Sequence, residues 1–421
     1  MPQDPGVFTS FKDRIPPYVI YSSGHGISSI GSWMQKTAVG WLAWELTHSP
    51  AWVGAIALSD LITALWVAPF AGAITDRSNP YKLLLLTQSL LLLMSLVLFS
   101  LTLSGLLSIW LLFFWAIIES SLQGFNTPAR MVAIGSLATT KQMGQAVATN
   151  SIAANLARSV GPAIAGVVMV SGHTANVFLL NALSYVAMFA TLIHLKGLLS
   201  RAPAAPKNIP IFGQIASGFQ YIIGSTQISL VFFLALAFAL LARPFTELFP
   251  AIAGQVLKGD PQLLAWLMTA QGIGALGAAV WFLKAKPIEM VVRVTLISAL
   301  GIAGALVIFS LSQPFWLILL MIALAGFFHA SCNIGMQTIA QTRSDPEYKG
   351  RVMALYGLTF RAAPAAGAFL MGVLAQWFNL QWLIGVAAAI FAILMLQKLS
   401  AFRIAFLVRP ATYWKDTNSQ Q

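Results

Sequence analysis

Long apolar runs recur along almost the whole chain and limit its possible folds more than any other feature. Each has about 18 or more residues between polar or Gly/Pro breaks, enough for a helix to cross a bilayer core. Only 9% of the 421 residues are charged, against roughly 25% in ordinary soluble domains. The sequence predicts an all-α integral membrane protein with twelve transmembrane helices in two six-helix bundles. The predicted spans are 17–44, 51–74, 82–104, 106–134, 143–170, 174–195, 224–253, 261–283, 288–311, 314–341, 350–377 and 379–402.

The basic residues lie almost entirely on one side of this layout. Of the 24 Lys and Arg residues, Lys258 falls on the other side and four lie inside spans: Lys36, Arg158, Arg243 and Arg361. All others lie in the N-terminus, the even-to-odd loops or the C-terminal tail, or at the span ends beside them. Because cytoplasmic loops carry an excess of Lys and Arg, we expect both termini to be cytoplasmic in the inner (plasma) membrane. The polar N-terminus lacks a signal-peptide core, so the first span should be retained.

The longest polar stretch divides the spans into six and six. We predict an N-terminal bundle at 1–195, a cytoplasmic linker at 196–223, a C-terminal bundle at 224–405 and a tail at 406–421. A short interfacial helix is expected at 211–222 within the linker. Matching residues at an offset of 202, such as Pro162 and Pro364, indicate that the bundles are repeats. Such a duplication places a binding site near the midplane between the halves.

Several motifs resemble the major facilitator superfamily, within it the exporters of enterobactin-type siderophores and the macrolide efflux pumps. The segment from Gly72 to Arg77 is similar to the superfamily's cytoplasmic signature, with Asn79 where a second Gly is usual. Gln123-Gly124 is similar to the end of a second signature, whose Arg is replaced by Ser120. Arg158 to Gly166 resembles the fifth-span antiporter motif, which in this superfamily accompanies export.

Three further segments are similar to stretches of the enterobactin-exporter group: residues 125–129, 243–250 and 349–356. Together, these resemblances cover nearly the whole chain. They imply a secondary transporter that works by alternating access, with gating residues in the fifth-span motif at Gly161, Pro162 and Gly166. A kinked, closely packed helix is the simpler explanation of that Gly-Pro run.

Buried charges can be paired by their depth along each span, at about 1.5 Å per residue. Glu119 and Arg158 fall at similar depths in spans four and five. Lys36 and Asp60 do so in spans one and two. Since buried ionisable groups mark ion pathways in membrane proteins, Glu119, Asp60 and Arg158 are candidates for proton coupling. The alternative is that these pairs only orient helices.

The remaining intramembrane charges are candidates for the substrate cavity. Arg243 and Glu247 are four residues apart and were expected on one face of one helix, in a pairing or gating role. Arg361 has no carboxylate at its own depth and is the best candidate to meet an anionic substrate, although His329, Asn333 or backbone carbonyls could satisfy it. The other cavity candidates are Lys36 and Trp33, whose indole could stack on an aromatic substrate.

A second charged group is expected at the cytoplasmic ends of spans two, three and eleven. It contains Asp76, Arg77, Lys82 and Arg351. If the family arrangement holds, Asp76 lies near the N-terminus of span eleven, where the helix dipole favours an anion. Such a contact would hold the cytoplasmic side closed. Ordinary positive-inside charge explains the basic residues equally well, but not the Asp.

Other classes of function lack support in the sequence. Cys332 is the single cysteine, and His25, His173 and His329 do not form a metal-ligand cluster with carboxylates. No phosphate-binding loop, dinucleotide fingerprint or nucleophile elbow is present, so neither an enzyme nor ATP-driven transport is indicated. We expect no cofactor other than the proton motive force, no metal, no nucleic acid and a monomer in the lipid bilayer.

The sequence therefore predicts an exporter of a small organic molecule, siderophore-like or amphipathic and drug-like, coupled to protons by antiport. An importer or symporter of the same fold is one alternative, which the fifth-span motif argues against. A non-transporting membrane scaffold or receptor is another, and it would leave Arg158, Glu119 and Arg361 without a role.

Overall fold

Helices make up nearly all of the computed structural model, which describes residues 15–408 except 140, 172, 200–210 and 283–286. No strand occurs in this described part. The first half contains α1 (Pro17–Thr47), α2 (Pro50–Arg77), α3 (Pro80–Leu103), α4 (Ile109–Leu137), α5 (Met143–Ser171), α6 (Ala175–His194) and α7 (Lys196–Leu199). The second half contains α8 (Ile211–Gly224), α9 (Thr226–Ala237), η2 (Phe238–Ala242), η3 (Pro244–Thr246), α10 (Phe249–Ala251), η4 (Ile252–Val256), α11 (Pro261–Phe282), α12 (Ile288–Leu311), α13 (Phe315–Arg343), α14 (Lys349–Leu374), α15 (Leu380–Arg403) and η5 (Ile404–Val408).

The predicted spans, except the seventh, coincide closely with these helices, so the all-α transmembrane fold is confirmed. Nine helices of the described part are long and apolar enough to cross a membrane by length and composition. α1, α2 and α4, with 31, 28 and 29 residues, are also longer than the roughly 20 residues that a span needs. The interfacial helix expected at 211–222 is α8, which continues to Gly224.

Local sequence explains where several helices begin. The side chain of Asn79 accepts hydrogen bonds from the backbone N–H groups of Tyr81 and Lys82, at 3.0 and 3.3 Å, and so caps α3. Pro80 follows at the first helical position, where its missing N–H costs nothing. Asn379 caps α15 in the same way, accepting from Gln381 at 2.8 Å and from Trp382 at 3.3 Å.

The seventh span is the one place where the helix expected from sequence is wrong. A single helix was predicted over 224–253, with Arg243 and Glu247 on one face. Instead α9 ends at Ala237 and is followed by the π-helical turn η2, the 3₁₀ turn η3 and a second π-helical turn, η4. Pro244 and Pro250 lack the backbone N–H that a continuous helix requires, which accounts for the break. Arg243 and Glu247 therefore do not share a regular helical face.

The chain packs into two units. One comprises Met1–Lys36, Trp66–Leu107 and Ile118–Pro206; the other comprises Thr37–Leu65, Ser108–Ile117 and Lys207–Gln421. The boundary between Pro206 and Lys207 lies inside the linker that was predicted at 196–223. Parts of α1, α2 and α4, however, pack with the second unit. In the first unit α3 lies against α6, and in the second α13 lies against α11 and α12, while α12 also contacts α15. These three helices thus contribute residues to both units.

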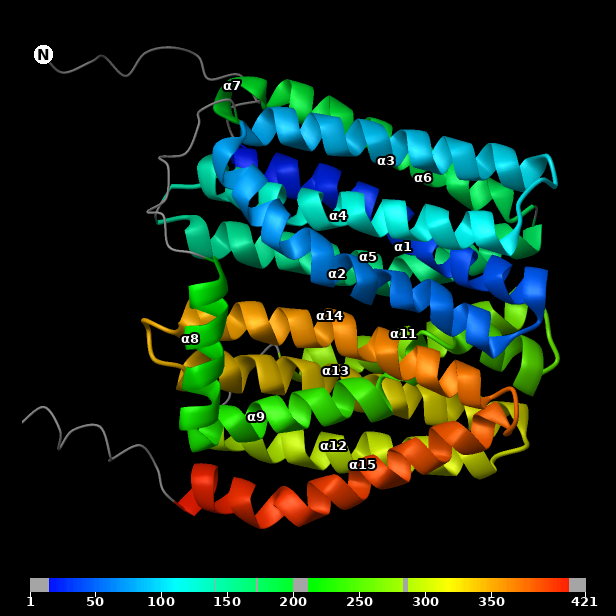
Figure 1. The fold of residues 1–421 in the computed structure, drawn as a ribbon, viewed down its shortest axis with the longest axis vertical. Helices are drawn as coiled ribbons and strands as arrows, with labels where there is room; N and C mark the ends of the chain where they lie inside the picture. The colour runs from blue at the N-terminus through cyan, green and yellow to red at the C-terminus, as the bar shows by residue number, and fades with distance from the viewer. Residues whose placement is uncertain (1–14, 140, 172, 200–210, 283–286, 409–421) are drawn as a thin grey trace, which may run out of the picture. The chain divides into compact units, whose positions relative to one another are not determined.

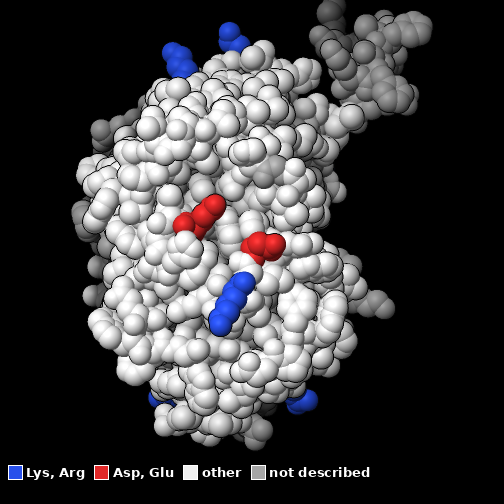
Figure 2. Space-filling view, turned by 90° about the vertical axis from the view of Figure 1, so that its right-hand side faces the viewer, with Lys and Arg blue, Asp and Glu red and all other residues white. Residues whose placement is uncertain are grey.

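The surface is that of a protein surrounded by lipid. Figure 2 shows one face on which charged side chains are few and most atoms are uncharged. Large apolar side chains point outward from many helices, for example Val167 (67% exposed), Ile297 (64%) and Trp316 (74%). A soluble monomer rarely exposes contiguous apolar surface of this extent. Because lipid tails solvate such side chains, this pattern fits helices embedded in a bilayer.

Candidate functional site

A tryptophan and two basic residues form the first cluster, in the first unit. The Arg158 guanidinium of α5 lies 5.3 Å from the centroid of the Trp33 ring in α1, and the Lys36 ammonium lies 5.6 Å from it. Both distances are within the range of cation–π attraction. Lys36 and Arg158 remain exposed, and Trp33 is half-buried. Three of the residues predicted from sequence are therefore brought together at one indole.

Gly161 allows this cluster to form. A Cβ atom at position 161 would stand 2.7 Å from the Cβ of Trp33 and 2.9 Å from the carbonyl oxygen of Ile30. Only glycine fits such a close approach of α5 to α1. Pro162 and Gly166 are buried beside it in α5. The Gly-Pro run thus has a packing role, and its predicted part in gating stays a prediction.

Glu119 lies on α4 near a buried polar network. The Gln123 side-chain amide donates a hydrogen bond to Glu119 at 3.1 Å. Glu119 also acts electrostatically on Tyr185, whose hydroxyl lies 3.3 Å from the Ser32 hydroxyl of α1. Its predicted pairing with Arg158 stays a prediction.

The polar network continues between α1, α3 and α6 and was not found by sequence reasoning. Ser95 donates to the Gln35 side-chain oxygen, and the Asn181 amide donates to the Ser95 hydroxyl at 3.0 Å. Ser184 in turn donates to the Asn181 side-chain oxygen at 3.0 Å. All four residues are buried. Uncharged polar residues in apolar spans were the available signal, since such groups are buried only with hydrogen-bond partners.

A buried histidine facing an arginine was also missed. His25 of α1 is 4% exposed, and the Arg130 guanidinium of α4 lies 2.9 Å from its Nε2. The Ser29 hydroxyl lies 3.3 Å from the same ring. Sequence reasoning assigned Arg130 to the cytoplasmic end of its span, yet its long side chain reaches a buried imidazole. A guanidinium cannot accept a hydrogen bond, so the ring nitrogen facing it must be the acceptor, which a neutral imidazole provides.

Arg243 is the centre of a second cluster, in the second unit. Its guanidinium donates to the Phe360 carbonyl oxygen and lies 5.4 Å from the Phe360 ring centroid. Asp60, Glu247 and Tyr356 act on it electrostatically. Glu247 thus acts on Arg243 as predicted, although through a broken helix rather than a regular one, and Asp60, which was predicted to pair with Lys36, also acts on Arg243.

Aromatic rings surround Arg243 and connect it to two other predicted residues. Phe360 stacks on Tyr356 at 4.8 Å, and the Tyr356 hydroxyl donates to the Asn333 carbonyl oxygen at 3.4 Å. The ring of His329 lies 5.5 Å from that of Phe238, the first residue of η2. The π-helical turn also supplies the hydrogen bond from the Arg243 N–H to the Phe238 carbonyl, at 2.9 Å. Such turns are frequent at functional sites.

Close glycine contacts join α2 to α14 within the second unit. A Cβ on Gly54 would lie 2.7 Å from the Ala368 carbonyl oxygen, and one on Gly372 would clash with the Pro50 carbonyl oxygen. At the end of α1 the Trp44 ring lies directly against Gly254. These backbone-to-backbone contacts were not predicted. The first two hold the N-terminal end of α2 against α14.

The other predicted residues have the following positions. Arg361 is exposed on α14, next to Phe360. Lys82 is exposed at the start of α3, and Arg351 lies on the first turns of α14, 5.1 Å from the Tyr348 ring centroid. The side chains of Asp76 and Arg77 lie outside the described part, so their predicted contact stays a prediction. So does the pairing of Lys36 with Asp60. In the described residues no group of three His, Cys, Asp or Glu side chains could hold a metal ion.

Comparison with known proteins identifies the family. Residues 18–411 match the family described as transmembrane secretion effectors. The chain belongs to this family. It is a major facilitator transporter, as the sequence motifs predicted, and its substrate is a small molecule. The chain is a multi-pass membrane protein.

Two curated relatives show which transporters the chain resembles. The chain is 26% identical over 354 residues to the staphyloferrin A transporter of Staphylococcus aureus, covering 83% of this chain and 87% of that protein. It is 27% identical over 278 residues to the enterobactin exporter EntS of Escherichia coli, covering 64% of this chain and 62% of that protein.

Solved structures of low sequence identity share the fold of this transmembrane secretion effector. A bacterial homologue of the iron transporter ferroportin, in an inward-facing state, superposes with a TM-score of 0.66 at 14% identity, covering 92% of this chain and 99% of that chain. The nucleoside transporter NupG does so with a TM-score of 0.65 at 13% identity, covering 94% and 100%. At such identities the likeness concerns architecture and not substrate.

Proposed function

We propose that this transporter exports an anionic, aromatic or amphipathic small molecule of the siderophore kind in exchange for protons. The observation that carries the proposal is the pair of cations, Arg158 and Lys36, beside one indole inside apolar spans. Charges are retained in spans chiefly where they serve a pathway or a ligand. A carboxylate or catecholate would engage the two cations, while the Trp33 ring offers a stacking surface.

Two carboxylates are the proposed proton carriers. Glu119 accepts a hydrogen bond from Gln123, which favours its charged form, and Asp60 acts on the Arg243 cation. A neighbouring cation also favours the charged form of a carboxylate, so moving the cation away makes protonation easier. Because antiport requires substrate and proton to bind in alternation, substrate binding must bring a cation closer to these carboxylates and so favour release of the proton.

Alternating access is the proposed mechanism, with both termini in the cytoplasm and the chain in the inner (plasma) membrane. The close contacts of Gly54 in α2 with Ala368 in α14, and of Gly372 in α14 with Pro50 in α2, would form the outer gate. They must separate in the state that releases substrate outside. No cofactor beyond the proton motive force, no nucleic acid and no second copy of the chain is required for this cycle.

The test is transport into everted membrane vesicles that contain the full chain. Staphyloferrin A and enterobactin are the probes, because the curated relatives are named for them. An exporter accumulates substrate in everted vesicles when a proton gradient is imposed, and it loses accumulation when an uncoupler is added. An importer accumulates it in right-side-out vesicles instead.

Variants then separate proton coupling from folding. Glu119→Gln and Asp60→Asn should each reduce gradient-driven accumulation at least about tenfold, the scale expected when a proton-transfer group is lost. Glu45→Gln is the matched control, because Glu45 is exposed at the end of α1. Unchanged gradient dependence in both carboxylate variants would refute proton antiport through these residues. The scaffold alternative predicts instead that the wild type accumulates no substrate in either kind of vesicle, and that neutralising Arg158, Glu119 and Arg361 leaves its function intact.

A further inference from the structure

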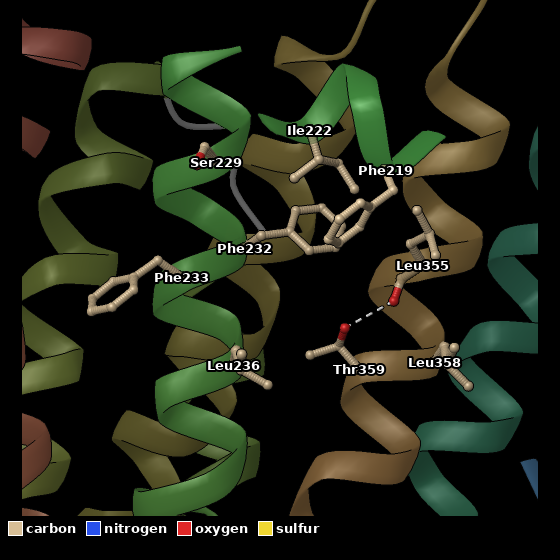
Figure 3. Close-up of a pocket in the computed structure, with 9 residues that line it drawn as sticks. All are labelled: Phe219, Ile222, Ser229, Phe232, Phe233, Leu236, Leu355, Leu358 and Thr359. Carbon is tan, nitrogen blue, oxygen red and sulfur yellow. Dashed lines mark hydrogen bonds between the residues drawn. The ribbon is translucent and has the colours of Figure 1, made fainter. Parts of the chain in front are cut away.

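An apolar cavity of about 340 Å³ lies in the second unit between the interfacial helix α8 and the spans α9 and α14. Figure 3 shows Phe219 and Phe232 reaching into the space between α9 and α14, with Ile222 beside them. The Thr359 hydroxyl donates a hydrogen bond to the Leu355 carbonyl oxygen of its own helix, at 3.0 Å. The lining therefore fits hydrocarbon and offers little to a polar ligand. The lining residues are Phe219, Ile222, Ser229, Phe232, Phe233, Leu236, Leu355, Leu358 and Thr359.

The cavity is open to the membrane at its rim. Phe219 of α8 and Leu236 of α9 are 58% and 47% exposed, so large apolar surface faces outward on either side of the cavity. In a bilayer this surface meets lipid tails rather than water. The molecule at hand to fill the cavity is therefore a membrane lipid.

A basic side chain lies at the α8 end of the cavity. Arg351 precedes the lining residue Leu355 by one helical turn, so both lie on the same face of α14. A Cβ on Gly218, the neighbour of Phe219, would stand 3.1 Å from the Cβ of Arg351, which shows that α8 rests directly on this residue. Lys349 is exposed two residues earlier. Positive charge thus adjoins the apolar cavity.

Contacts between α8 and the start of α14 fix the position of the α8 end of the cavity. The Tyr221 ring stacks on that of Tyr348 at 4.5 Å, and the Asp345 backbone N–H donates to the Tyr221 hydroxyl at 3.0 Å. Partial burial raises the pKa of Tyr221, so the phenol stays neutral at pH 7. Figure 1 shows α8 running across the ends of α9 and α14 rather than along them. A helix in that orientation lies at the depth of lipid headgroups.

We propose that this cavity binds an acyl chain of an anionic phospholipid, with the lipid phosphate held by Arg351. Guanidinium groups pair well with phosphate oxygens, and an apolar slot that begins one turn away takes the chain. Zwitterionic lipids carry the same tails without net negative charge. The site should therefore prefer phosphatidylglycerol to phosphatidylcholine, and this preference is independent of any transport substrate.

The experiment measures lipid retention by native mass spectrometry of the purified full chain, with phosphatidylglycerol and phosphatidylcholine of identical dioleoyl chains. The wild type should retain phosphatidylglycerol about fivefold more strongly, as expected for one basic residue at an anionic headgroup. Arg351→Gln should remove most of this preference. The matched control is Arg343→Gln, since Arg343 also lies at a helix end and over an aromatic ring, that of Phe406 at 5.9 Å, away from the cavity lining.

A second variant tests the acyl slot separately from the charge. Ser229→Phe places a ring in the cavity and should lower retention of both lipids, whereas Ile223→Phe, on an exposed position of α8 outside the lining, should leave it unchanged. Equal retention of the two lipids by the wild type would overturn the headgroup assignment. An equal effect of Arg343→Gln would do the same, and full retention by Ser229→Phe would overturn the cavity assignment. Transport assays are not needed for any of these outcomes.

Discussion

Replacing Gly54 with a larger residue should hold the proposed outer gate open. A Cβ at this position would lie 2.7 Å from both the Ala368 carbonyl oxygen and the Phe369 Cα, whereas carbon atoms in ordinary contact are about 3.5 Å or more apart. Both obstacles are backbone atoms and cannot swing aside. Overpacking of this kind costs typically about 1–3 kcal/mol. If the cost falls only on the closed state, the equilibrium shifts toward the open state by about 5- to 150-fold.

The assay is labelling of an introduced cysteine from outside intact cells with a membrane-impermeant maleimide. Ala57→Cys is the reporter, because Ala57 lies one turn after Gly54 and is 8% exposed. The native Cys332 is buried, so background labelling is low. Adding Gly54→Val should raise the initial labelling rate at least about fivefold, and Gly54→Ala should give a smaller increase.

The control is Gly304→Val, the same substitution in mid-helix of α12. A Cβ on Gly304 meets nothing within 4 Å, so this variant reports general effects of valine on the bundle. Size-exclusion profiles identify variants that fail to fold. If Gly54→Val is folded and labelled no faster than Gly304→Val, the contact between α2 and α14 is not a gate.

Two further predictions concern the first unit. Trp33→Ala should raise the KM for an aromatic siderophore about fivefold or more, since aromatic stacking is worth about 1–3 kcal/mol. Trp33→Phe keeps most of the stacking, so its KM should lie between those of the wild type and Trp33→Ala. Equal KM values in the wild type and Trp33→Ala would show that the indole is not part of the site. Arg130→Leu should lower the thermal unfolding temperature by several degrees, because the buried His25 loses its guanidinium donor and keeps only the longer contact with Ser29, a loss of about 1–3 kcal/mol. His25→Leu combined with Arg130→Leu should recover part of this loss, and a Tm unchanged by Arg130→Leu would contradict this role.

The fold was largely predictable because membrane spans depend on length and hydropathy. Apolar runs in water-free surroundings have to form helices, so the bounds of α5 and α12 follow almost directly from the sequence. The break after Ala237 was missed because apolar content continues through it. The signal was available in Pro244 and Pro250, which a continuous helix tolerates poorly.

The sites were only partly predictable because sequence gives depth but not direction. Arg158 and Trp33 could be placed at compatible depths, but which way each helix turns is decided by packing at Gly161. For Arg130 it was the depth of the side chain that was predicted wrongly. Its backbone position near a span end indicated a cytoplasmic charge, whereas its long side chain reaches a buried His25. Arginine side chains extend far enough to change level in the membrane, so backbone depth alone misplaces them.

Helix α1 connects the proposed binding and gating events. Its first part, up to Lys36, packs in the first unit, and its remainder, from Thr37, packs in the second. Lys36 is the last residue of α1 in the first unit, one turn after Trp33. The far end of the same helix places Trp44 against Gly254. A substrate anion drawn to Lys36 and Arg158 would act on α1 itself, and a rigid helix transmits a small rotation along its length to Trp44. Neutralising Lys36 should thus alter both substrate affinity and gate labelling, whereas a residue used only for binding would alter the first alone.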